Sequence, residues 1–251
     1  MSAGDAVANH WQSYYDHRAA DGETAHFMQV LGYHPHSGDD YEGLFNRILA
    51  DIDRKLQIRE GQRFLDIACG FGVFSRHLAH AANWAVGTDL AGGLLREGRA
   101  LPLPQGARTL DAMVQANAAA QPFRGECFDR ILCFGMFFHL NPEAARSVVR
   151  EIVALLRPGG RALIGDVLDP RRIHFERSYV DRIPTALHLA LSHALRMKAA
   201  IARWRGKVVY QAFAPRFFSD LLPDGVECEF YERKDDGRRN NASRYDVAIQ
   251  R

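Results

Sequence analysis

Two acids and two glycines mark the part of this sequence that could hold a ligand. Asp66 lies in an apolar run, residues 64–67, and Gly70 and Gly72 follow it just before residues 74–82, whose spacing predicts a helix. Glycines let a ligand reach the backbone, and the first N–H groups of a helix are open to it. An acid placed just before such a turn gains nothing from a pyrophosphate, so it favours a positively charged ligand.

A second acid, Asp89, stands 23 positions after Asp66 (89 − 66) and closes the next apolar run, residues 84–88. An acid in this place can accept hydrogen bonds from ribose hydroxyls. Residues 70–75 match the dinucleotide fingerprint only weakly, as G-x-G-x-x-S. Together the two acids suggest a nucleoside that carries a positive group.

The composition is that of a globular α/β protein. The 251 residues are 47% hydrophobic with a formal charge of +2, which predicts one domain with an appendage and no nucleic-acid partner. Four cysteines form no CxxC pair, so we expect reduced thiols. The histidines near the N-terminus lack ligand spacing, and no metal is expected. We find no signal segment and no transmembrane segment, and we expect a cytoplasmic protein.

Strand-like and helix-like segments alternate after the turn, as in a parallel sheet covered on both faces. Further strands are predicted at residues 84–88, 112–116, 129–134 and 160–167, and helices at residues 91–99 and 142–156. Right-handed crossovers then predict a doubly wound α/β sheet. Two later strand-like runs, residues 226–233 and 245–250, predict a hairpin-like pair around a polar turn at residues 235–237.

This pattern divides the chain into four regions. Residues 1–59 are expected to form a helical N-terminal cap, with helices over residues 5–18 and 40–56. Residues 60–167 form the ligand-binding core, and residues 168–216 a helical insertion with a basic surplus and an amphipathic helix over residues 183–204. Residues 217–251 supply the C-terminal strands that complete the sheet.

Five segments then carry a family resemblance. Residues 65–72 follow the pattern acid-x-Gly-x-Gly-x-Gly, with Ala68 in the place of the first glycine, and residues 86–90, 116–123, 128–134 and 155–160 follow in order. Over about residues 60–167 the sequence resembles class I S-adenosylmethionine-dependent methyltransferases. The resemblance implies a Rossmann-like, mostly parallel seven-stranded sheet. It also implies S-adenosyl-L-methionine as cofactor, with S-adenosyl-L-homocysteine as product.

The resemblance also implies a set of cofactor-binding residues. The turn would take the methionine portion with Asp66 near its ammonium group, Asp89 would hold the ribose, and Leu90 would pack on the adenine. Asn117 stands where family members usually have an acid, so its contact with the adenine amino group would lack charge assistance. The full set is Tyr14, Asp66, Ala68, Cys69, Gly70, Gly72, Asp89, Leu90, Asn117, Ala118, Phe134 and Gly135.

Two residues are candidates for catalysis, His139 after the fourth strand and Asp166 in the fifth. A hydroxyl acceptor gains from a group that takes its proton, and histidine is the obvious type. His139 could instead bond a backbone carbonyl, and Asp166 could bind backbone amides. The aromatic N-terminal segment either packs the cap onto the core or covers the active site, where Tyr15 would meet the substrate.

The sequence indicates the methyl acceptor less clearly than the methyl donor. Arg171, Arg172 and Arg177 could pair with an anionic acceptor, although basic residues on a helix are also typical of a solvated face. Our first hypothesis is O-methylation of a small molecule, such as a natural-product or sugar intermediate. The alternatives are a lipid or quinone, with the amphipathic helix resting on a membrane, a macromolecule, or a silent cofactor-binding protein. The sequence leaves a homodimer open.

Overall fold

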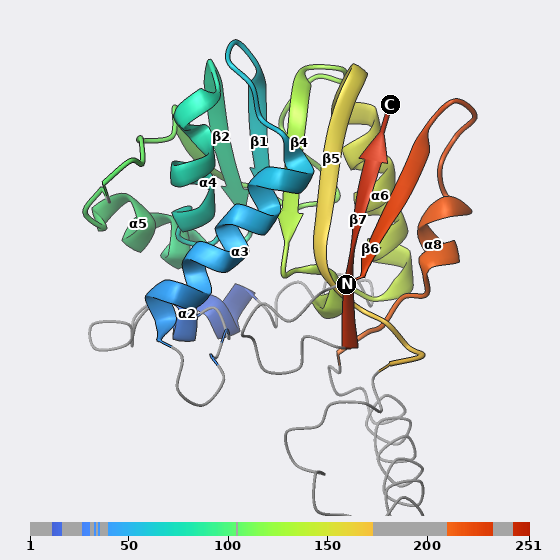
Figure 1. Cartoon of the computed structure of the whole chain (residues 1–251), viewed down its shortest axis with the longest axis horizontal. Helices are drawn as coiled ribbons and strands as arrows, with labels where there is room; N and C mark the ends of the chain where they lie inside the picture. Colours follow the sequence, from blue (N-terminus) through green and yellow to red (C-terminus); the bar gives the residue numbers. More distant parts are fainter. Residues whose placement is uncertain are drawn as a thin grey trace, which may run out of the picture.

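The computed structural model describes residues 12–16, 27–30, 33, 35, 40–103, 105–172, 210–232 and 243–251. In these residues a seven-stranded sheet stands between helices on its two faces (Figure 1). The predicted amphipathic helix over residues 183–204 and the polar turn at residues 235–237 lie outside the described residues. Within the described ranges no helix is long and apolar enough to cross a bilayer.

Five strands of the sheet run parallel, as the alternation of strands and helices predicts. They are β1 (Arg63–Ile67), β2 (Trp84–Asp89), β3 (Ala112–Gln115), β4 (Phe128–Phe134) and β5 (Leu156–Leu168). The C-terminal strands β6 (Glu227–Glu232) and β7 (Arg244–Gln250) pair antiparallel, and β7 also pairs antiparallel with β5. The order is β3-β2-β1-β4-β5-β7-β6, which confirms the predicted fold class.

Two apolar clusters hold the helices on the sheet. On one face α3 (Tyr41–Leu56), α4 (Val73–Leu78) and α5 (Gly92–Ala100) pack on side chains that include Phe64. On the other face α6 (Pro142–Leu155) and α8 (Pro215–Ser219) pack on side chains that include Leu65. Adjacent strand residues point to opposite faces, so both faces of β1 are buried. Figure 1 shows α3 in front of the sheet and α6 behind it.

The two long helices begin where their sequences predict. Asp40 caps α3, its carboxylate accepting the Gly43 N–H at 2.6 Å, and the stripe Leu44, Ile48, Ile52 and Leu56 is buried. Asn141 caps α6 by accepting the Ala144 N–H at 2.8 Å, directly before Pro142.

Some boundaries differ from the predicted ones. The helix expected over residues 74–82 ends at Leu78 and tightens into a short 3-10 helix, η1 (Ala79–Ala81), as helix ends often do. Strand β5 begins at Leu156, earlier than residue 160, but its regular pairing with β4 starts only at Arg161, beyond Pro158 and Gly159. The short helices α2 (Phe27–Val30) and α8 were not expected.

Candidate active site

A cavity of about 370 Å³ opens at the carboxyl ends of the parallel strands, beside β1 and β4, where the strand order reverses. The turn after β1, the ends of β2 and β4, the start of α6 and the N-terminal residues 12–16 all contribute to its walls. Of the residues proposed for the cofactor, ten line it: Asp66, Ala68, Cys69, Gly70, Asp89, Leu90, Asn117, Ala118, Phe134 and Gly135. Tyr15 and His139 line the same cavity.

The turn after β1 is held in an uncommon backbone conformation. Ala68, Gly70 and Gly72 all have positive φ, at +61°, +57° and +71°. Glycine adopts this conformation freely, whereas alanine pays a steric cost at residue 68. The Cys69 N–H donates to the Thr88 carbonyl at 2.9 Å, and the Gly70 N–H donates to the Asp89 carboxylate at 2.8 Å. The turn is therefore fastened to the end of β2.

Gly98 allows α5 to approach this turn closely. A Cβ atom at residue 98 would lie 2.4 Å from the carbonyl oxygen of Phe71, and Phe71 is part of the turn's backbone. Any larger side chain there would push α5 away from the turn. The close contact keeps Leu94 of α5, together with Leu90 and Ala91, on the wall of the cavity.

Asp66 is the deeper of the two acids. Its side chain is 3% exposed and its carboxylate accepts a short hydrogen bond from the Ser75 hydroxyl of α4. Burial raises the pKa of Asp66 to about 7, the Ser75 hydrogen bond opposes this rise, and the charge of Asp89 adds to it. A cation bound in the cavity would lower the pKa and favour the ionised form.

Asp89 is anchored by backbone groups on two sides. One oxygen accepts the Gly70 N–H and the other accepts the Ala91 N–H, each at 2.8 Å. Burial raises the pKa of Asp89, and these hydrogen bonds partly offset the rise. A carboxylate has about four lone-pair positions, so both oxygens can still accept from a ligand's hydroxyl groups.

Asn117 uses its amide oxygen within its own loop. The oxygen accepts the Ala119 N–H at 2.9 Å, and Asn117 stands at the cavity wall in the loop after β3. The amide oxygen has a second lone pair, so a further hydrogen bond to a ligand is still available. The adenine contact proposed for Asn117 stays a prediction.

The N-terminal segment, residues 12–16, closes one side of the cavity. The Tyr15 hydroxyl lies 3.0 Å from Nε2 of His139, 124 positions along the chain. Asp16 accepts the Gly93 N–H at 2.6 Å and so binds the start of α5. Gln12 and Tyr15 line the cavity, whereas Tyr14 is 39% exposed and packs edge-on against Tyr15. The segment therefore both packs on the core and covers the site.

His139 lies in a short 3-10 helix, η2 (Phe137–His139), directly after β4. Its side chain is 7% exposed, and its ring packs against those of Phe138 and Tyr210, with centroids 4.2 and 5.7 Å away. The hydrogen bond to Tyr15 places its Nε2 at the cavity. This is a position from which the imidazole could exchange a proton with a bound substrate.

Tyr33 is a residue of the site that sequence reasoning missed. Its hydroxyl stands over Gly135 after β4, where a Cβ atom would lie only 2.4 Å away, and its ring packs near Phe74 and Phe134. Tyr33 also lines the cavity. Its segment has no helical or strand periodicity from which the contact could be predicted. The sequence signal for it is Gly135, whose missing side chain leaves room for the Tyr33 hydroxyl.

Five predicted site residues do not line the cavity: Tyr14, Gly72, Asp166, Arg171 and Arg172. Gly72 instead is the N-cap residue directly before α4. Arg171 pairs with Asp169 at 2.9 Å, and Arg172 pairs with Glu232 of β6. Asp166 is buried and pairs with Arg244 at 2.8 Å. The last predicted substrate contact, Arg177, lies outside the described residues.

Known proteins share both the sequence and the fold of this core. Residues 64–160 match the profile of a family described as a methyltransferase domain. This part of the chain therefore resembles a methyltransferase domain. Within the matched range, the methyltransferase domain carries the turn, Asp89 and His139, whereas Tyr15 and Tyr33 come from the cap before it.

A curated relative shares sequence with about half of this chain. Demethylmenaquinone methyltransferase of Mycobacterium bovis (strain BCG / Pasteur 1173P2) is 32% identical over 133 residues, which are 53% of this chain and 52% of that protein. The chain thus spans about half the length of this relative in the alignment.

Two solved structures resemble the whole chain in fold. Magnesium protoporphyrin IX methyltransferase from Synechocystis PCC 6803, solved with bound S-adenosylhomocysteine, has a TM-score of 0.61 at 13% identity and covers 98% of this chain and 99% of its own. Phosphoethanolamine N-methyltransferase 1 of Haemonchus contortus, solved with phosphoethanolamine and S-adenosylhomocysteine, has a TM-score of 0.64 at 14% identity and covers 100% of this chain and 50% of its own. At these identities the likeness concerns the fold alone.

Proposed function

We propose that this chain is an S-adenosylmethionine-dependent methyltransferase that acts on a small molecule, with a hydroxyl oxygen as the acceptor atom. The observation that carries the proposal is that Asp89, our candidate for the ribose contact, and the Tyr15–His139 pair line the same cavity. The methyltransferase family match and the two solved methyltransferases with S-adenosylhomocysteine support the choice of cofactor.

The residues of the cavity fit such a cofactor. Asp89 offers carboxylate oxygens for ribose hydroxyls, and apolar groups of Leu90, Leu94 and Ala116 offer a wall for a flat base. The buried carboxyl of Asp66 gains a favourable interaction when a cation enters. The backbone of the turn, with no side chain at Gly70, lets the amino-acid portion lie close.

S-adenosylmethionine would supply an electrophilic methyl group on a sulfonium sulfur. The chain's own residues would hold the acceptor oxygen in line with the carbon–sulfur bond and exclude water. As the methyl carbon–oxygen bond forms and the carbon–sulfur bond breaks, the hydroxyl proton must leave. His139 would take that proton at Nε2. The single lone pair of this nitrogen accepts from the Tyr15 hydroxyl before the substrate binds, so the acceptor hydroxyl would replace Tyr15 as its hydrogen-bond partner.

A quinone-type acceptor is the second candidate, and the curated relative named demethylmenaquinone methyltransferase favours it. The aromatic rings of Phe138 and Tyr210 beside His139 suit a planar ring. The reduced, hydroquinone form of such an acceptor carries hydroxyl protons, so His139 would accept a hydroxyl proton from either candidate. The ring type of the acceptor distinguishes them.

Methyl transfer tests this proposal directly. The protein is incubated with methyl-labelled S-adenosylmethionine and panels of hydroxylated metabolites and soluble hydroquinones. We expect label in one panel, and we expect His139→Gln to lower kcat about 100-fold or more with cofactor affinity within about twofold. Tyr15→Phe should lower kcat less. Equal turnover of wild type and His139→Gln would contradict the proton-accepting role.

A further inference from the structure

Asp166 occupies an unusual position in β5, a strand that otherwise pairs regularly. Its φ is +67°, and it lies where the pairing of β5 with β7 shifts between Ile164 and Val167. The Asp166 N–H donates to the Asp246 carboxylate at 2.8 Å, and Asp246 is fully buried. A non-glycine residue in this conformation is strained and persists where its surroundings hold it.

The group that holds Asp246 comes from the N-terminal cap. The buried ammonium of Lys55, in α3, donates to the other Asp246 oxygen at 2.6 Å and also pairs with Asp51. A buried ion pair with further hydrogen bonds holds its side chains firmly in place, because breaking it would leave a buried charge without a partner. The cap, β7 and the strained residue of β5 are thus joined by direct polar contacts.

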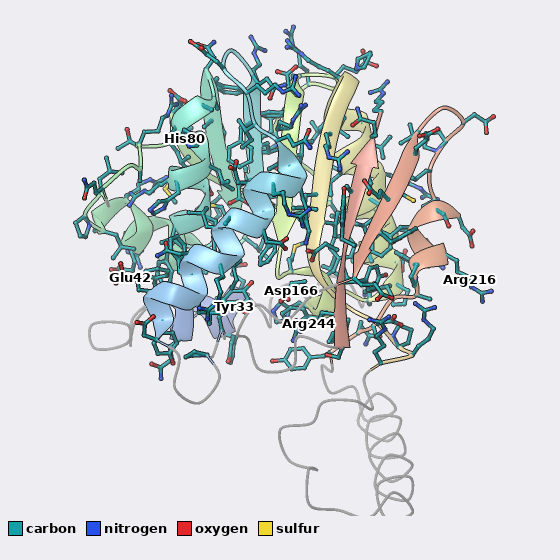
Figure 2. The ribbon with its side chains drawn as sticks, viewed as in Figure 1. Tyr33, Glu42, His80, Asp166, Arg216 and Arg244 are labelled. Carbon is teal, nitrogen blue, oxygen red and sulfur yellow. The ribbon has the colours of Figure 1, made fainter. Side chains whose placement is uncertain are left out.

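The Asp166 carboxylate continues this chain of contacts toward the active site. It pairs with Arg244 Nη1 at 2.8 Å, and the guanidinium lies over the Phe138 ring at 5.0 Å from its centroid. Phe138 precedes His139, and their ring centroids are 4.2 Å apart. The Phe138 carbonyl also accepts the Gln211 N–H at 2.8 Å. Figure 2 shows Asp166 and Arg244 at the same edge of the sheet as Tyr33, far from His80.

We propose that Arg244 is a positioning residue: it holds the Phe138 ring in place within η2 and so sets the orientation of the neighbouring His139 ring. This inference rests on the proposed function for its catalytic meaning, because His139 is the proton acceptor there. Asp166 acts through Arg244 and holds the guanidinium in place, instead of meeting the substrate. The contacts of Arg244 with Asp166 and Phe138 carry this positioning role, and none of these three residues lines the cavity.

The two contacts of Arg244 require a guanidinium. Its planar fork donates to the carboxylate at one end while its flat face covers an aromatic ring. A lysine can keep the charge beside Asp166 but offers a point charge and no flat face. Arg244→Lys therefore keeps the ion pair, which supports stability, and removes the contact with Phe138, which supports the orientation of the His139 ring.

The test observes His139 by NMR in full-length protein labelled at histidine ¹³Cε1. His139→Gln identifies the signal, and His80, an exposed histidine distant from Arg244, serves as an internal reference. We expect Arg244→Lys to move the His139 signal by more than its linewidth while the His80 signal and the melting temperature stay near wild type. Arg157→Lys is the matched control, because Arg157 is a half-buried arginine paired with Asp129 elsewhere in the fold.

A coupling experiment tests whether Arg244 acts through Phe138. In a Phe138→Leu background we expect Arg244→Lys to have little further effect on the His139 signal, so that the two changes are not additive. Phe138→Tyr should keep the wild-type response. An unmoved His139 signal in Arg244→Lys, or an equal displacement in both backgrounds, overturns the proposal.

Calorimetry with S-adenosylhomocysteine separates this proposal from the proposed function. Arg244→Lys should bind S-adenosylhomocysteine within about twofold of wild type, since Arg244 lies outside the cavity wall. If wild type itself shows no binding, the proposed function fails. The NMR comparison needs no ligand, so it still decides whether Arg244 positions His139.

Discussion

At the scale of single residues, Asp66 is buried while its carboxyl group faces a cavity suited to a cation. Burial raises its pKa from the ordinary 3.8 to about 7. Between these values the folded protein holds a proton that the unfolded chain has lost. The stabilisation from this site is therefore complete below the unfolded pKa and is lost as the pH rises through about 7.

Asp66→Asn should remove this pH dependence. We expect the stability of wild type relative to the Asn variant to fall as the pH rises from about 4 to about 7, by up to roughly 4 kcal/mol. Asparagine keeps the shape and can still accept from Ser75, so the comparison isolates the titration. Urea denaturation of both proteins at a series of pH values measures it, and parallel stability curves would contradict the assignment.

Ala68 offers a second residue-scale prediction, because it holds a positive φ of +61° that glycine adopts without strain. Ala68→Gly should leave the free energy of unfolding unchanged or raise it by up to about 1 kcal/mol. The control is Ala50→Gly in the middle of α3, which should cost about 1 kcal/mol. Thermal denaturation compares the two, and equal losses would show that residue 68 is not strained.

At the scale of elements, a hydrogen bond links the N-terminal segment to the start of α5. Asp16 accepts the Gly93 N–H at 2.6 Å, and this bond keeps Gln12 and Tyr15 over the cavity. Asparagine can cap a helix as well as aspartate, whereas alanine cannot. The segment therefore depends on an acceptor atom at residue 16 more than on a charge.

Asp16→Ala should weaken binding of S-adenosylhomocysteine about three- to tenfold, because loss of a cap costs about 1 kcal/mol. Asp16→Asn should stay near wild type. Isothermal titration calorimetry at one pH measures both variants. Equal affinities for the Ala and Asn variants would show that the cap does not hold the segment over the site.

The elements that sequence predicted best are those with a strong period and a cap. Strands β1, β2, β4 and β5 and helices α3 and α6 bury the faces that their apolar spacing predicts, and β6 and β7 pair as expected. The short helices α2 and α8 were missed, since five residues or fewer carry little periodicity. Tertiary packing, which no local pattern contains, defines them.

At the scale of the whole molecule, the site gathers residues that lie far apart in the chain. Most residues proposed for the nucleoside could be placed at the cavity from the sequence, because they lie in short motifs at the ends of successive strands. The Tyr15–His139 bond spans 124 positions and the Arg244–Asp166 pair spans 78, and no spacing rule predicts such partners. The cap, the core and the C-terminal strands meet at the carboxyl edge of the sheet, where β7 brings Arg244 and Asp246 beside Asp166.

The central claim is that this cavity binds S-adenosylmethionine through Asp89, and calorimetry with the full-length protein tests it most directly. At a pH above 7, where Asp66 is ionised, we expect one-site binding that Asp89→Asn weakens about 10- to 100-fold, through loss of charged hydrogen bonds. Asp111→Asn is the matched control: like Asp89, Asp111 accepts a backbone N–H, that of Ala85, but it lies outside the cavity. Absence of heat with wild type, or equal affinity in Asp89→Asn, would contradict the claim.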